Sequence, residues 1–164
     1  MKRIVLVLLL AISAPTAFAQ GFGLGFSAGY LSEIDGFGGS ADLIYEFNEK
    51  FGVSTNATFS QADNQSLRRK WWIMDLNLRY KVIDQWYVFA GGEYLSQTFK
   101  ELGLGGGNPI GGTTPDENAT FFGANIGTGY KYNLMDNVNL FADVKYVAIE
   151  SGYVHTRLGI QFDF

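Results

Sequence analysis

Residues 153–164 at the end of the chain read YVHTRLGIQFDF. Alternate positions form an apolar set, broken only by a threonine: Val154, Thr156, Leu158, Ile160, Phe162 and Phe164. The positions between them are mostly polar: Tyr153, His155, Arg157, Gly159, Gln161 and Asp163. Because successive side chains of a β-strand point to opposite faces, this segment predicts a strand with one apolar and one polar face.

The same alternation recurs along the rest of the chain, over residues 22–30, 41–47, 51–60, 72–80, 86–94, 122–131 and 140–146. Apolar side chains interrupt the polar set at Ile44, Ile73, Phe89 and Phe141. The connections alternate between short turns (48–50, 82–85, 133–137) and longer polar or Gly-rich loops (32–38, 61–70, 97–119), with a short one near 150–152. This pattern predicts an all-β fold, an eight-stranded antiparallel up-and-down transmembrane β-barrel.

The N-terminal residues have the features of a signal peptide. Lys2 and Arg3 form a positive start, residues 4–12 are an apolar run, and Ala17-Phe18-Ala19 is a small-x-small cleavage site. The run is too short to span a bilayer as a helix. We expect a signal peptide over residues 1–19 and an outer-membrane β-barrel domain over residues 20–164.

The composition narrows the function further. The chain has 16% aromatic residues and only 3 prolines, which favours strands. It has no cysteine and a single histidine, so no disulfide, metal site or cofactor is predicted. Its formal net charge of −4 argues against a nucleic-acid partner.

Aromatic residues recur eight positions apart on the apolar faces and predict two aromatic girdles: Phe22 and Tyr30, Phe51 and Phe59, Trp72 and Tyr80, Trp86 and Tyr94, Phe122 and Tyr130. Eight strand residues rise about 26 Å, or about 20 Å after a tilt near 40°, close to the height of an outer-membrane apolar band. The apolar faces are therefore predicted to meet lipid. A lipocalin-like soluble barrel would instead turn them inward around a ligand cavity.

An outward apolar face places the charged side chains of the strands inside the barrel. The predicted interior charge network comprises Asp42, Glu46, Asp75, Arg79, Glu93, Lys131, Asp143, Lys145, His155 and Arg157. Buried charges require partners, and side chains can fill an eight-stranded barrel. We expect a charge-paired plug without a wide pore. A narrow path for protons or small ions is the alternative.

The chain resembles the small outer-membrane β-barrel family of Gram-negative bacteria, porin-like proteins that include the OmpA barrel domain and the OmpX/Ail-type and opacity-like proteins. The resemblance rests on the terminal GIQFDF of residues 159–164, the FADVKY of residues 141–146 and the aromatic strand ends. It implies a bacterial outer-membrane location with the loops facing outside. It also implies that Ile160, Phe162 and Phe164 form the signal read by the barrel-assembly machinery.

The expected function is that of an integral outer-membrane protein, a monomer surrounded by outer-membrane lipid and lipopolysaccharide. Its role is expected to be structural, in envelope integrity, or a surface interaction in which the external loops contact lipopolysaccharide or a host. Arg68, Arg69 and Lys70, beside an aromatic belt, are candidate contacts for lipopolysaccharide phosphates. A narrow channel is the second hypothesis and a lipid A-modifying enzyme the third. The resemblance to lipid A deacylases fails at Arg157, where their pattern has serine, and the alternation turns His155 inward. No catalytic residue is predicted.

Overall fold

A computed structural model describes residues 21–64, 67–101, 117–149 and 152–164; the predicted signal peptide lies outside these ranges. All the regular structure in the described residues is β-strand. Eight strands are present there: β1 (Phe22–Leu31), β2 (Gly36–Glu46), β3 (Phe51–Asn64), β4 (Leu67–Lys81), β5 (Trp86–Glu101), β6 (Glu117–Met135), β7 (Val138–Ala148) and β8 (Tyr153–Asp163). No helix in these ranges is long and apolar enough to cross a membrane.

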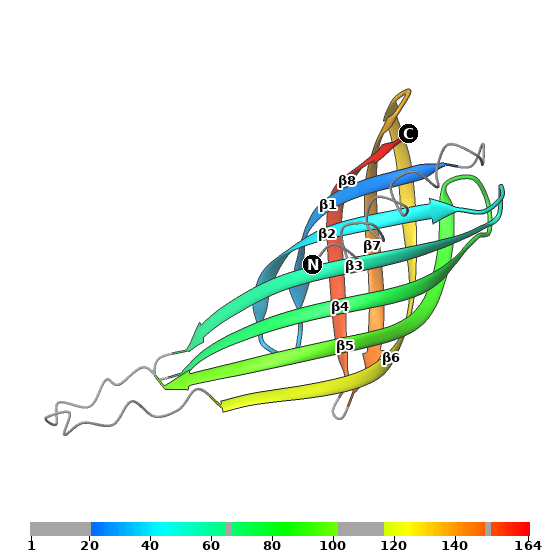
Figure 1. Ribbon diagram of the computed structural model, residues 1–164. Coiled ribbons are helices and arrows are strands. Elements are labelled where there is room, and N and C mark those ends of the chain that lie inside the picture. Colours follow the sequence, from blue (N-terminus) through cyan, green and yellow to red (C-terminus); the bar gives the residue numbers. More distant parts are fainter. Residues whose placement is uncertain (1–20, 65–66, 102–116, 150–151) are drawn as a thin grey trace, which may run out of the picture.

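The strands form one closed antiparallel barrel (Figure 1). Each strand pairs with its neighbour in the chain, and β8 returns to pair with β1. The last residue continues this closure, because the Phe164 amide donates to the Phe22 carbonyl oxygen at 2.8 Å. The predicted eight-stranded up-and-down β-barrel is therefore confirmed.

The two ends of the barrel differ. The turn end carries the connections after β2, β4 and β6 together with the start of β1 and the end of β8. Its first turn is capped by Asn48, whose Oδ1 accepts from the backbone amides of Lys50 and Phe51 at 2.9 and 2.8 Å. The loop end carries the connections after β1, β3, β5 and β7.

Strands β3 to β6 are longer than predicted and extend beyond the other strands at the loop end (Figure 1). Residues 61–70 and 97–119 were expected to be loops, but the β3–β4 ladder continues to Asn64↔Leu67 and the β5–β6 ladder to Phe99↔Glu117. The turn predicted over 133–137 is likewise shorter, since β6 runs to Met135. The expectation was wrong because the apolar-polar alternation fades in these extensions, whereas backbone pairing does not depend on it.

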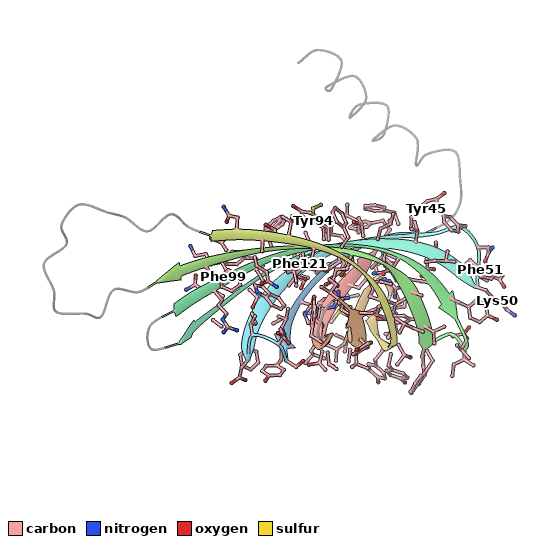
Figure 2. All side chains as sticks on the ribbon, turned by 90° about the horizontal axis from the view of Figure 1, so that it is seen from below. Tyr45, Lys50, Phe51, Tyr94, Phe99 and Phe121 are labelled. Atoms are coloured by element: carbon pink, nitrogen blue, oxygen red, sulfur yellow. The ribbon has the colours of Figure 1, made fainter. Side chains whose placement is uncertain are left out.

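The outside of the barrel is apolar. Leu76, Leu78, Ile126 and Leu158 are each more than half exposed, whereas the residues that alternate with them are buried or half-buried. The girdle residues face outward, and several lie directly opposite one another across neighbouring strands: Phe51 and Tyr80, Phe59 and Trp72, Trp86 and Tyr130, Tyr94 and Phe122. Register thus assembles the aromatics into two levels, with Phe51 toward the turn end and Tyr94 toward the loop end in Figure 2.

The closed hydrogen-bond ladder predicts resistance to detergent. Unboiled protein in SDS should migrate on a gel differently from boiled protein, because SDS alone does not separate strands that lack a free edge. Identical mobility of the two samples, with the protein in the soluble fraction, would contradict a membrane-embedded barrel.

Candidate functional site

The barrel interior is the candidate site, and its first layer lies at the turn end. Lys81 Nζ donates to Glu46 Oε2 at 2.5 Å. Lys131 Nζ lies 3.1 Å from Asp163 Oδ2 and 4.0 Å from Glu46 Oε1. Asn139 Nδ2 also donates to Asp163, at 2.8 Å. The charged side chains of this layer are partly exposed, so water screens their charges.

A buried arginine organises the middle layer. The Arg157 guanidinium on β8 donates to Asp143 through Nε at 2.9 Å and Nη2 at 2.6 Å, and to Asp42 through Nη1 at 2.8 Å. Asn56 Nδ2 donates to the same Asp42 oxygen at 2.9 Å, and Thr58 donates to Asn56 at 2.7 Å. One base thus joins β2 and β7 to β8 through a two-pronged contact that fits carboxylates.

A buried lysine organises the third layer, nearer the loop end. Lys145 Nζ lies 2.6 Å from Asp75 Oδ2 and 2.7 Å from Glu93 Oε2, and its side chain is 1% exposed. The Tyr153 hydroxyl donates to the other Glu93 oxygen. The ammonium therefore binds carboxylates from β4 and β5 across the barrel from its own strand β7.

Two members of the predicted charge network make no ion pair within the described part of the chain. The Arg79 guanidinium lies over the Tyr87 ring, 4.0 Å from its centroid, as a cation–π contact. His155 is fully buried, and neither ring nitrogen has a hydrogen-bond partner there. Its interior position follows the alternation, but the expected participation in the network is wrong, because the interior acids of these layers pair with Lys145 and Arg157 instead.

An apolar cluster, which the sequence analysis did not foresee, fills the barrel at the loop end. This apolar plug consists of Leu31, Ile34, Trp71, Ile73, Leu95, Val147, Ile149 and Tyr153. All its members are at most 9% exposed. In the sequence, Ile73 is an apolar residue on the otherwise polar face of its segment, and this interruption was the signal that could have predicted an apolar layer inside the barrel. The plug lies at the end opposite the partly exposed charged layer.

Inward aromatic rings fill the interior between the charged layers. Phe89 and Tyr87 on β5 lie opposite Gly127 and Gly129 on β6, where an added Cβ would meet the rings at 2.4 and 2.3 Å. Glycine leaves the space that each ring occupies. One cavity among these residues, bordered by Arg79 and other interior side chains, has a volume of about 10 Å³, about one water molecule at most.

The structure divides the predicted basic cluster between the two faces of β4. Lys70 is exposed on the outward face, two residues beyond Trp72. Arg69 shares the inward face with the buried Trp71. The Arg68 side chain lies outside the described residues. A single patch of Arg68, Arg69 and Lys70 is therefore wrong, because neighbouring residues of a strand point to opposite sides.

The residues of the predicted assembly signal, Ile160, Phe162 and Phe164, are exposed on the outer surface near the closing seam. The Phe164 ring lies 6.4 Å from that of Phe22 on β1. Their outward placement leaves them accessible from the lipid side in the closed barrel. Recognition by the assembly machinery stays a prediction.

A closed barrel with an apolar exterior and a charged interior defines an integral β-barrel membrane protein. The sequence matches the family of the outer membrane protein beta-barrel domain over residues 4–163, and the chain belongs to this family. Its location is the bacterial outer membrane, as the resemblance in the sequence implied. No curated protein matches the sequence.

Several solved structures share the fold. A major outer membrane protein from Thermus thermophilus is 17% identical, with 89% of this chain and 100% of that chain covered and a TM-score of 0.73. The N-terminal β-barrel domain of Pseudomonas aeruginosa OprF is 19% identical, with 88% and 97% covered and a TM-score of 0.62. Ail, the attachment invasion locus protein of Yersinia pestis, is 15% identical, with 88% and 97% covered and a TM-score of 0.58. At these identities the similarity concerns the fold alone.

The Lys145 layer predicts a large stability effect. The substitution Lys145→Ala leaves Asp75 and Glu93 without their base inside the barrel, and should lower the free energy of unfolding by about 3–5 kcal/mol. Urea unfolding in lipid vesicles would measure the loss. The neutral combination Lys145→Met, Asp75→Asn and Glu93→Gln should recover most of it.

Lys50→Ala, which removes an exposed base at the turn end, is the matched control and should leave stability unchanged. If Lys145→Ala were as stable as the wild type, the ion pairs would not hold the barrel together.

Proposed function

We propose that the protein is a non-conducting, non-enzymatic outer-membrane barrel that acts at the cell surface by binding lipopolysaccharide phosphates with its long hairpins. The observation that carries the proposal is the outward position of Lys70 beyond the loop-end girdle. Two strand residues rise about 7 Å, so the ammonium stands at the depth of lipid headgroups when Trp72 lies at the interface. Lys70 faces Gln61 and Thr98 on the neighbouring strands.

The outward face of this extension is polar around Lys70. Thr98 Oγ1 donates to Asn118 Oδ1 at 2.8 Å between β5 and β6. Such a face suits a hydrated, phosphate-rich layer, where a lysine binds phosphate as a point charge. The loop end is the outer side in this proposal.

The barrel interior favours a non-conducting protein over the narrow-channel alternative. The apolar plug lies toward the loop end, and the described cavity beside the inward aromatics holds about one water molecule at most. The buried bases Lys145 and Arg157 are held by acids on both sides. An ion would have to displace these pairs and then cross an apolar layer, which costs several kcal/mol.

The position of His155 supports a non-enzymatic role. A lipid A-modifying enzyme would need its histidine at the lipid surface or at the outer rim, whereas His155 is fully buried inside the barrel. Its strand neighbours toward the lipid are Val154 and Thr156.

Because the interior is filled, we expect the protein to conduct no ions. Purified protein in a planar lipid bilayer should give no conductance steps above those of the bare bilayer. Reproducible steps that disappear on neutralising Lys145, Asp75 and Glu93 together would support the narrow channel instead.

The lipopolysaccharide proposal predicts a specific loss on Lys70→Ala. One charge-assisted contact is worth about 1 kcal/mol, so binding of fluorescent lipopolysaccharide to the protein in phospholipid nanodiscs should weaken about fivefold. Lys70→Arg should retain binding, and high salt should weaken the wild type toward the variant.

Lys50→Ala is the control, because it removes an equally exposed lysine at the opposite end of the barrel. Equal binding by the wild type, Lys70→Ala and Lys50→Ala would overturn the proposed contact.

A further inference from the structure

The four long strands form a wall above the apolar plug, and the inner face of this wall lies toward the loop end (Figure 1). Strand alternation places Ala62, Arg69, Gln97, Phe99, Ala119 and Phe121 on that face, with Trp71 and Leu95 of the plug just below. This inner face is termed the loop-end mouth. Arg69 lies directly opposite Ala62 on β3 and Phe99 on β5, and Trp71 lies opposite Gln97.

Two hydrogen-bond donors in the mouth lack acceptors. Arg69 Nε and Trp71 Nε1 are both buried, and neither has a partner within the described ranges. Arg69 also makes no ion pair there, unlike Arg157 deeper in the barrel. A buried donor without an acceptor costs about 1–3 kcal/mol, and more when it is charged. The two side chains are successive on one face of β4, so one anionic group could accept from both.

The surroundings of these donors are apolar. Phe121 and Ala62 are half-buried against the plug, and Phe99 is half-buried farther along the extended strands, as Figure 2 shows. Directly below, the Trp71 ring packs on Tyr153 with their centroids 5.3 Å apart. A ligand that accepts from the two donors and also covers the apolar side chains around them therefore combines an anionic head with an apolar body.

We propose that the loop-end mouth binds a small amphiphilic carboxylate from the external medium. The carboxylate accepts from the Arg69 guanidinium, whose planar fork matches two carboxylate oxygens, and from Trp71 Nε1. The apolar body rests on Phe99 and Phe121. The plug forms the floor, so the ligand is held at the mouth and does not pass through the barrel.

The position of Arg69 on the inner face indicates whether the ligand comes from the membrane or from the medium. Lys70 on the outward face of β4 meets the headgroups of surrounding lipid, whereas Arg69 is turned away from them by the strand itself. In this proposal a freely diffusing anion approaches the inner face from the loop end. This site is therefore independent of the lipopolysaccharide contact proposed above.

The probe is 4-phenylbutyrate, and the reporter is the indole of Trp71. Substituting Trp72→Phe and Trp86→Phe leaves Trp71 as the only tryptophan of the full chain. Titration in phospholipid nanodiscs should give a saturable change in fluorescence with 4-phenylbutyrate and none with 4-phenylbutylamine, its cationic counterpart. Arg69→Ala or Arg69→Gln should weaken binding at least tenfold, and Arg69→Lys should weaken it less, because the charge is kept and the fork is lost.

Lys50→Ala is the charge-matched control and should bind as the parent does. The heat-dependent gel shift shows which Arg69 variants are folded, and only those are compared. Equal affinity in the parent and a folded Arg69→Ala or Arg69→Gln variant would overturn the proposal. Equal binding of the amine, or no saturable response in the parent, would also overturn it.

Discussion

Pairing of β8 with β1 is the constraint on which the rest of the structure depends. Lipid offers no partner to backbone N–H and C=O groups, so a sheet in a membrane must have no free edge. The ladder from Gly23↔Asp163 to Leu31↔His155 removes that edge. Once the sheet is closed, every strand residue within the membrane faces either lipid or the interior, and the alternation of the sequence assigns each side chain to one of them.

The closed interior is filled in three different ways along its length. Near the turn end the charges remain partly wet, so their attraction is screened. Around Arg157 and Lys145 the charges are dry, and each base is held between carboxylates from different strands. Toward the loop end apolar side chains replace charges, and hydrophobic burial takes over from ion pairing. The polar layers tie distant strands together, and the apolar layer seals the barrel.

Much of the candidate site could be predicted from strand alternation, which placed Asp75, Glu93 and Lys145 inside. Their assembly into one layer could not, since it depends on the stagger of strands across the barrel. The same limit applies to the apolar interruptions of the polar faces. Phe89 appeared as an irregularity because its partner, Gly127, lies on another strand, and nothing local to either residue shows that one fills the space of the other.

The sequence by itself determined the strands, the outward apolar face and the two aromatic levels, because each follows from a period of two residues and from the thickness of a membrane. Only the tertiary structure decided how far β3 to β6 extend and where the plug lies. It also decided which environment each of two neighbouring basic side chains enters on opposite faces of a strand. Arg69 and Lys70 show the difference: they are one cluster in the sequence and two environments in the barrel. The physical reason is that pairing partners, register and closure set the environment of a side chain, and these are properties of several strands together.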